Sequence, residues 1–501
     1  MPAVATPPKS PLRLGVATQP VWRRADLRAL ARRRLCAGFD SAETSPHNRR
    51  HWAKADSLSA DAAGSPEVRR TLRERARYEV ANNSYAKGIV LTLANDCVGT
   101  GPRLQLLTDR DDLNRQLEHD FAAWGAAVAL PEKLRTMRLA RCQDGEAFGL
   151  LAFNPRVAHP VQLDLLLLEA EQVASPWRQL ADEHEVDGVV LDDHGNPAAY
   201  RVWRQHPGGP GRLGSDQFVT VPAAAMVHVF RQDRPGQHRG IPEITPALPL
   251  FAQLRRFTLA VLAAAEAAAD FAGILYTDAP ANGEADAVEP MDLIELERNM
   301  LLTMPGGWKM AQVEPMQPAT TYAEFKHELL NEIARCLNLP FNIAAGNSSG
   351  YNYASGRLDH QTYFKAVRVD QSFTAARVLD RVLAAWLREY AVLTGNVALL
   401  RALPPHQWFW DGFEHVDPAK EAAAQETRLR NHSTTLAHEY ARQGKDWEVE
   451  LRQRAKELRL MAELGIAPPA SAPAAPPTPA PAPNPTELND PDEEEASDDA
   501  A

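Results

Sequence analysis

The sequence predicts a predominantly helical α+β protein. Much of the chain between Ser65 and Leu464 carries apolar residues at helical spacing, whereas strand-like runs begin at Phe148 and are restricted to a central part and one later segment. With 501 residues, of which 45% are hydrophobic and 24% charged, the chain is long enough to bury several cores. We therefore expect more than one domain.

Two bulk features exclude whole classes of protein. No window reaches about 18 uninterrupted apolar residues, because Glu266 interrupts the longest candidate, Thr258 to Ala269, so we expect no membrane span. The four cysteines are far apart and form no CxxC pair. This spacing argues against a zinc site or a disulfide framework and suits a reducing compartment.

The negative charge is concentrated at the C-terminal end. The formal net charge is −11, and residues 467–501 hold eight acidic residues without Lys or Arg, which leaves −3 for the rest of the chain. A near-neutral body is not typical of a tight DNA binder, because sequence-independent affinity comes from cations that neutralise phosphates. Any contact with DNA should be weak.

Both ends of the chain predict poorly folded segments. Residues 1–40 read as a flexible basic arm with an arginine cluster, made up of Arg23, Arg24, Arg28, Arg32, Arg33 and Arg34. A transit peptide is the alternative, but no clear cleavage signal follows; a surface for nucleic acid or a neighbouring subunit is a further interpretation. Residues 467–501, rich in Pro and Ala and acidic, predict a disordered tail.

The elements of the first half follow from local patterns. Residues 65–97 predict a helix, with a proline in its first turn and glycines after its end, and residues 113–141 repeat the helical pattern. Residues 188–202 predict a hairpin, because turn formers at 193–197 separate two β-rich runs. A calcium loop is the alternative for these acids, but the EF-hand spacing is missing.

The second half predicts long helices. Eight alanines between Ala260 and Ala272 favour a helix from about 250 to 275 that can pack closely against copies of itself or other helices. A helix at about 322–337, an irregular stretch at 338–356 and a long helix to about Thr394 follow. An aromatic segment at 407–413 predicts a strand, and residues 420–464 predict two or three amphipathic helices with a break at Gly444.

One enzyme motif requires a test. Gly346-Asn-Ser-Ser-Gly350 fits G-x-S-x-G, in which Ser348 would be the nucleophile of a serine hydrolase, with Asp380, His432 and a loop at His206 as partners. That motif needs a strand before it and a helix directly after it. The sequence predicts a helix before it and a delay after it, so we expect a polar loop instead.

No other catalytic or cofactor pattern emerges. The phosphate-binding pattern G-x-x-x-x-G-K-[ST] does not occur, and Gly444-Lys445 lacks the upstream glycine. His-x-x-x-His zinc spacing is also missing, and Asp359-His360 reads as a solvated helix face. We expect no catalytic residues, no cofactor and no metal.

An ordered series of segments resembles the lambda family of phage portal proteins. The series runs over roughly residues 40–415, and its most specific member is Arg234-Pro-Gly-Gln-His-Arg-Gly-Ile-Pro. Other members are Leu58-Ser-Ala-Asp-Ala-Ala, Asn82-Asn-Ser-Tyr-Ala-Lys-Gly, Val98-Gly-Thr-Gly, Arg141-Cys-Gln-Asp-Gly-Glu-Ala-Phe, Val227-His-Val-Phe and Leu339-Pro-Phe. The first twenty residues and the acidic tail lie outside the resemblance.

The resemblance implies a portal fold with wing, stem, clip and crown that assembles as a ring. Its expected parts, after the basic arm, are an α/β wing domain (41–240), a stem helix (241–275), a clip (276–320), a second stem helix (321–337), a tunnel loop (338–357), a tunnel helix with a wing strand (358–416) and a helical crown (417–466). The disordered tail (467–501) completes the chain.

The resemblance also implies a function. Such a protein is the non-enzymatic head-tail connector of a tailed bacteriophage or prophage, through which double-stranded DNA is packaged and ejected. Expected DNA-channel residues lie in the tunnel loop, namely Asn347, Ser348, Ser349, Tyr351 and Asn352. Cations of the stem helices are expected either to line the channel or to form intersubunit salt bridges, namely Arg255, Arg256 and Lys326.

The partners follow from the same resemblance. A homo-oligomeric ring, typically a dodecamer, would bind double-stranded DNA weakly and without sequence preference, dock the terminase large subunit and then head-tail adaptor proteins, and contact the major capsid or scaffold protein. Twelve helices about 10 Å across would close a ring with a bore a little under about 30 Å, wide enough for duplex DNA. The expected location is the portal vertex of the virion, after assembly in the bacterial cytoplasm. A capsid-associated interaction protein without a channel remains an alternative.

Overall fold

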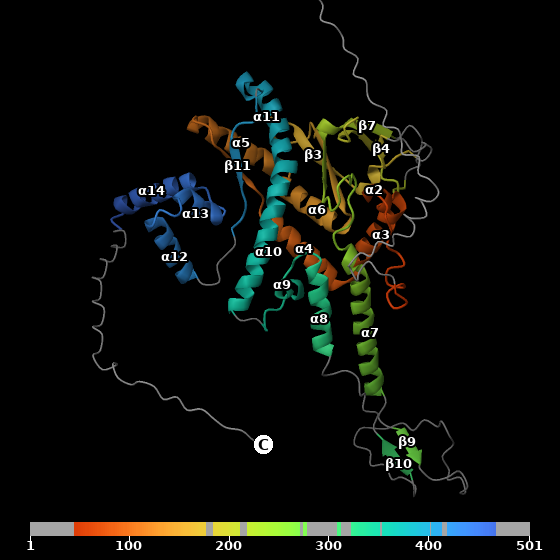
Figure 1. Cartoon of the computed structure of the whole chain (residues 1–501). Coiled ribbons are helices and arrows are strands. Elements are labelled where there is room, and N and C mark those ends of the chain that lie inside the picture. Colours follow the sequence, from red (N-terminus) through yellow and green to blue (C-terminus); the bar gives the residue numbers. More distant parts are fainter. Residues whose placement is uncertain are drawn as a thin grey trace, which may run out of the picture. The chain divides into compact units, whose positions relative to one another are not determined.

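The computed structural model describes residues 45–176, 184–210, 218–270, 274–277, 308–311, 322–350, 353–400, 402–412 and 418–466. The chain divides into two compact units, residues 1–59 and residues 60–501. In the described part of the first unit, residues 45–54 form turns, one of which is closed by the Ser45 backbone N–H donating to Asn48 Oδ1. The described helices and strands belong to the second unit (Figure 1).

A short helix, α2 (Ala60–Ala63), precedes two longer ones, α3 (Pro66–Asn82) and α4 (Ser84–Val98). Ser65 caps α3, since its hydroxyl accepts from the Val68 N–H. Asn83 separates α3 from α4, because its side-chain oxygen accepts from the N–H groups of Tyr85 and Ala86 and so starts a new helix. The prediction of one helix over 65–97 is therefore wrong in its continuity.

The next helical stretch is also divided. Helix α5 (Asp111–Ala127) and helix α6 (Leu130–Gln143) are separated at Ala129, which adopts the left-handed conformation with φ 53°. An alanine gives no sequence signal for this conformation, which mostly glycine and asparagine adopt. The chain turns there because Leu130 and Leu134 are buried in the core.

Two antiparallel sheets follow. The first has the order β3-β2-β8, and the second has the order β4-β5-β6-β7. Their strands are β2 (Glu146–Phe153), β3 (Leu163–Leu168), β4 (Glu185–Val186), β5 (Val189–Leu191), β6 (Pro197–Trp203), β7 (Phe218–Pro222) and β8 (Met226–Phe230). The predicted hairpin is confirmed as β5 and β6, and Asp192 closes its turn by accepting from the N–H groups of His194 and Asn196.

The alanine-rich helix is confirmed as α7 (Leu248–Asp270). Strands β9 (Ile274–Thr277) and β10 (Trp308–Ala311) pair with each other, and α8 (Tyr322–Arg335) follows. The stretch expected to be irregular holds a short helix, α9 (Phe341–Ala345). Helix α10 (Tyr353–Thr374), a π-helical segment (Ala375–Leu379) and α11 (Asp380–Thr394) then form the predicted long helix.

The C-terminal elements match their sequence patterns. The aromatic segment contains β11 (His406–Phe409), which pairs with β1 (Arg103–Leu106) about 300 residues away in sequence. Three helices follow: α12 (Pro418–Arg430), α13 (Leu436–Arg442) and α14 (Trp447–Glu463). Gly444 lies at the predicted break with φ 71°. Single 3₁₀ turns occur at Ala170–Gln172, Ala223–Ala225, Thr245–Ala247 and Val397–Leu400.

The main core joins the helices. Trp124 of α5 and Trp386 of α11 are fully buried, and Phe121 stacks edge-on against Trp386 with ring centroids 5.4 Å apart. A second, smaller core between the two sheets contains Phe148, Tyr200 and Met226. These two cores hold in place the helices and sheets that carry the candidate site residues.

One helical stretch, Thr245–Glu266, is long and apolar enough to cross a membrane by length and composition alone. This is weak evidence, because core helices of proteins outside membranes pass the same test. Phe251 and Leu254 of this stretch lie in the main core. The absence of a membrane span stays a prediction.

Candidate functional site

The expected channel loop connects α9 to α10. Helix α9 ends at Gly346, whose left-handed conformation (φ 64°) lets its N–H and that of Asn347 bond back to Asn342. The Ser349 N–H donates to Asn347 Oδ1 at 2.9 Å, forming a local turn. Asn347, Ser348 and Ser349 are all exposed and uncharged. Tyr351 and Asn352, the other two expected channel residues, lie outside the described residues.

The base of this loop is fastened to the core. Asn342 of α9 lies 2.9 Å from His360 of α10, measured between Nδ2 and Nε2. One turn further along α10, the Tyr363 hydroxyl donates to Asp96 of α4 at 2.6 Å. Burial raises the pKa of the Asp96 carboxyl, although the bond from Tyr363 opposes the shift. The loop therefore projects from two helices whose positions are set by buried polar contacts.

Two of the three expected stem cations contact tyrosines of their own chain. Arg255 of α7 donates to the Tyr78 hydroxyl at 3.3 Å and lies over that ring. Lys326 of α8 lies over Tyr85 with its Nζ 5.0 Å from the ring centroid. Partial burial would lower the pKa of Lys326, but hydrogen bonds to Tyr85 and Tyr322 raise it.

Arg256, the third expected stem cation, is exposed and forms no ion pair with the described residues. It lines a shallow groove with Gln253, Phe257 and Ala260 of the same helix. The expectation of channel-lining or intersubunit roles for these three cations stays a prediction.

The structure does not assemble the serine hydrolase constellation among the described residues. Helix α9, not a strand, precedes Ser348. Asp380 instead accepts from Trp408 Nε1 at 2.9 Å and lies 3.1 Å from His406 Nε2. His432 follows α12 in a left-handed turn, and Ser348 has no hydrogen bond to it or to Asp380.

Residues 234–242, the segment that is most specific to the family resemblance, contribute Arg239 and Gly240 to a buried ion cluster. Glu146, the first residue of β2, is fully buried. Arg239 Nη2 donates to it at 2.6 Å, the Gly240 N–H at 2.9 Å, and His228 lies 3.1 Å from it. Gly240 is required at its position, because an added Cβ would lie 2.1 Å from the Gly145 carbonyl oxygen.

Charge compensation sets the protonation states in this cluster. Burial alone would raise the pKa of Glu146, but Arg239 and His228 hold it well below its usual range. Burial lowers the pKa of His228 despite the neighbouring Glu146 carboxylate. Glu146 is therefore ionised, and His228 is neutral with Nε2–H as the donor, because a carboxylate can only accept.

A second buried cluster links the end of the same segment to two helices. Glu243 accepts from Arg138 at 2.9 Å and from Arg141 at 2.8 Å, and both arginines of α6 also pair with Asp370 of α10. Burial opposes ionisation, but the two guanidinium groups lower the pKa of Glu243 and of Asp370. Segment 234–243 thus connects the sheets to α6 and α10.

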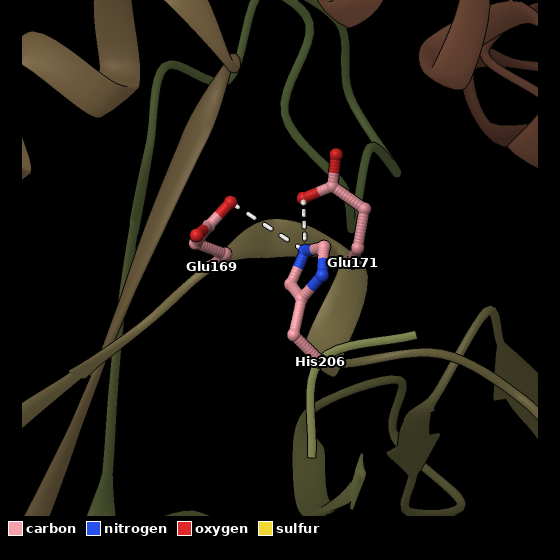
Figure 2. A group of neighbouring side chains, drawn as sticks. All are labelled: Glu169, Glu171 and His206. Carbon is pink, nitrogen blue, oxygen red and sulfur yellow. Dashed lines mark ion pairs between the residues drawn. The ribbon is translucent and has the colours of Figure 1, made fainter. Parts of the chain in front are cut away.

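One group of side chains has the donor types of a metal site (Figure 2). His206 Nε2 lies 3.5 Å from Glu169 Oε2 and 3.8 Å from Glu171 Oε2. However, Arg77 contacts both carboxylates, at 3.2 and 2.9 Å, and Arg73 contacts Glu171 at 3.2 Å. Two guanidinium groups already compensate these acids and would repel a cation, so we assign no metal here.

The sequence patterns do not reveal the two buried clusters. Segment 234–242 stands out only through the family resemblance, and no pattern assigns a role to Glu146 or Glu243. A signal was present, since four arginines alternate with apolar residues on predicted helices, at Arg69, Arg73, Arg138 and Arg141. Their acidic partners lie up to 232 positions away in the chain, as Arg138 and Asp370 show.

Comparison with known proteins gives a family match. The sequence profile of the family described as "Phage portal protein, lambda family" matches residues 46–371. A relative described as "Probable portal protein", from Halomonas phage phiHAP-1, is 26% identical over 435 residues, which cover 80% of this chain and 82% of that protein.

Solved structures show weaker similarity. The virion of a native gene transfer agent particle contains a chain that is 13% identical, with a TM-score of 0.43, covering 77% of this chain and 97% of that one. The neck of the native particle, computed with C12 symmetry, contains one that is 16% identical, with a TM-score of 0.40, covering 75% and 93%. TM-scores below 0.5 do not establish a shared fold.

Proposed function

The chain belongs to the lambda family of phage portal proteins, and we propose that it forms the ring channel at one capsid vertex through which double-stranded DNA enters and leaves. The observation that carries this proposal is the family match over residues 46–371, which includes both sheets, α7 to α9 and most of α10. As a portal protein, the chain is a structural component of a virion.

The proposed parts of the subunit follow the described elements. The wing (41–240) contains α2 to α6 and both sheets, and the two stem helices (241–275 and 321–337) are α7 and α8. The clip (276–320) lies mostly outside the described residues. The tunnel loop (338–357) includes α9, the tunnel helix and wing strand (358–416) include α11 and β11, and the crown (417–466) is α12 to α14.

We propose that DNA contacts in the channel are brief and uncharged. Asn347, Ser348 and Ser349 are exposed on the segment between α9 and α10, and the sequence contains no Lys or Arg from Gly346 to Gly356. Hydroxyl and amide groups can bond phosphate oxygens without releasing counterions, so they hold DNA much less tightly than cations do. Such a lining would let kilobases of duplex slide past it.

The proposed partners are those that membership of the portal family implies. The ring would dock the terminase large subunit at the clip during packaging and head-tail adaptor proteins afterwards, and it would be built into the capsid with the major capsid or scaffold protein in the bacterial cytoplasm. ATP hydrolysis would belong to the terminase, because no phosphate-binding pattern occurs in this sequence.

The test is DNA packaging by the phage or prophage that encodes the chain. A stop codon early in its gene should reduce nuclease-protected DNA in the lysate to background, and the wild-type gene supplied on a plasmid should restore it. Heads that fill with DNA without the protein would contradict the proposal.

The same packaging assay distinguishes a portal protein from a serine hydrolase that uses Ser348. The Ser348→Ala gene should restore packaging as well as the wild type, since no acid or histidine is aligned with Ser348 among the described residues. Loss of packaging together with loss of an ester-hydrolysing activity in this variant would favour the hydrolase. A capsid-associated interaction protein without a channel would differ by remaining monomeric.

A further inference from the structure

Helix α8 carries a row of exposed carboxylates that form no ion pair with a Lys or Arg of the described residues. The acidic row consists of Glu324, Glu328 and Glu332, all exposed. Each residue advances an α-helix by about 100°, so the three carboxylates fall within about 80° of arc and span about 12 Å. Only Glu328 has a charged neighbour among the described residues, His327 of the same helix at 3.3 Å.

Helix α10 carries a matching row of cations. The basic row consists of Arg357, Lys365 and Arg368, all exposed and without ion pairs to the described residues. They also fall within about 80° of arc and span about 16 Å. The two acids of this helix point elsewhere: Asp370 pairs with Arg138 and Arg141, and Asp359 lies about 200° around the helix from Arg357.

Neither row is compensated by an opposite charge of the residues that the structure describes, apart from the His327 contact of Glu328. No ion pair joins α8 to α10 among the described residues, although like charges spaced at i, i+4 or i, i+3 destabilise a helix. Large apolar side chains accompany both rows: Phe325 beside the acidic row is 51% exposed, and Leu358 and Val369 beside the basic row are 66% and 65% exposed. Charge with exposed apolar surface is typical of a protein interface.

We propose that the acidic row of α8 in one subunit packs against the basic row of α10 in the next. This inference rests on the proposed ring, whose subunit contact it identifies. The two surfaces differ, so the contact is heterologous, which is the type that closes rings of more than two copies. The two rows are similar in length, and the three negative charges of the acidic row match the three positive charges of the basic row in number.

A second copy explains the observations better than DNA does. DNA phosphates would pair with the basic row but would leave the acidic row uncompensated and repel it if it faced the same channel. DNA would also leave Leu358 and Val369 without an apolar contact. A neighbouring subunit compensates both rows and covers Phe325, Leu358 and Val369 at once.

The experiment reverses each row separately. Glu328→Arg/Glu332→Arg and Lys365→Glu/Arg368→Glu should each fold like the wild type by circular dichroism but raise the concentration for half-assembly at least about tenfold, measured by mass photometry. The neutral pairs Glu328→Gln/Glu332→Gln and Lys365→Gln/Arg368→Gln should weaken assembly less. The control is Arg70→Glu/Arg75→Glu, which changes two exposed cations of α3 and has the same charge change as Lys365→Glu/Arg368→Glu. This control should assemble normally.

Mixing gives the sharper result. The first reversed protein has a net positive charge on both rows and the second a net negative charge on both. At a concentration where the wild type forms rings, neither should assemble alone, whereas an equimolar mixture should form rings of alternating copies. Combining all four substitutions in one chain should also restore assembly. Reversed proteins that fold and form rings alone, or a mixture and a four-substitution chain that stay unassembled, would overturn the contact.

These outcomes separate this inference from the proposed function. A wild-type protein that never forms rings, with or without capsid partners, would remove the channel. Wild-type rings that survive both reversals would remove only this contact. Intact rings whose Lys365→Glu/Arg368→Glu form loses salt-sensitive DNA binding would assign the basic row to DNA instead.

Discussion

The buried Glu146 carboxylate joins β2 and β8 of one sheet to the segment around Arg239. Replacement by Gln keeps the size but removes the fully buried one of the two carboxylates that pair with Arg239, the other being Asp187 at 3.1 Å. The loss should lower the free energy of unfolding by about 3–5 kcal/mol. Urea denaturation followed by tryptophan fluorescence would measure this. Asp233→Asn, which breaks the half-exposed pair with Arg231, should cost less than about 1 kcal/mol. Equal costs for the two variants would contradict the role of the cluster.

The same cluster predicts how stability depends on pH. The folded pKa values of Glu146 and His228 are both lower than their usual values, so the unfolded chain binds more protons in acid. Their contribution to stability should be complete above about pH 6.5 and should fall as the pH decreases, first through His228 and then through the carboxyl, given their usual pKa values. Thermal melts from pH 7.5 to 4.5 should show a falling Tm; a Tm that rises over this range would refute the assignment.

Gly240 tests the close approach of two backbone segments. Gly240→Ala would place a methyl group 2.1 Å from the Gly145 carbonyl oxygen, and the overpacking should cost at least about 1–3 kcal/mol. Gly88→Ala in α4 is the control, because nothing lies within 4 Å of its added Cβ. That substitution should stabilise the helix by about 0.5–1 kcal/mol. Comparable stability of the two variants would show that the segments separate easily.

At the scale of single residues, the sequence predicts a channel loop and stem cations but not the contacts that these residues make. Arg255 and Lys326 lie against Tyr78 and Tyr85, which precede them by more than 170 positions. Nothing in the local pattern of α7 or α8 indicates that these tyrosines are near. The sequence shows which positions of α7 and α8 are charged, but only the folded structure shows which side chains contact them.

At the scale of elements, strong local signals were sufficient. The alanine-rich run, the hairpin turn and the break at Gly444 each appear where the sequence predicts them, because helix propensity and turn chemistry act within a few residues. The break at Ala129 was missed because an alanine gives no local signal for the left-handed conformation. The break at Asn83 was missed because its side chain caps a new helix inside a continuous helical pattern. The pairing of β1 with β11 was missed because it joins distant segments.

The attachment of α10 gives a prediction at this scale. Tyr363 donates to Asp96 and fastens the middle of α10, which follows the proposed tunnel loop, to α4. Tyr363→Phe should leave the Asp96 carboxyl without that donor and lower the free energy of unfolding by about 1–3 kcal/mol. Hydrogen exchange should be faster around Tyr363 in the middle of α10. Protection equal to that of the wild type would show that the bond does not hold the helix.

At the scale of the whole molecule, family membership assigns a portal role. The low density of cations agrees with the proposal of a channel that binds DNA only weakly. The chain carries 54 basic and 65 acidic residues, and eight of the acids lie in the last 35 positions. Its exposed rows of opposite charge on α8 and α10 favour self-association. Assembly is therefore the property on which the channel depends.

The most direct measurement is the mass and end-on symmetry of the purified protein, by multi-angle light scattering and negative-stain electron microscopy. We expect a ring with a central hole and a mass near that of twelve 55.2 kDa chains, about 660 kDa. A protein that stays monomeric at high concentration, at several salt levels and in the presence of capsid or scaffold protein would contradict it.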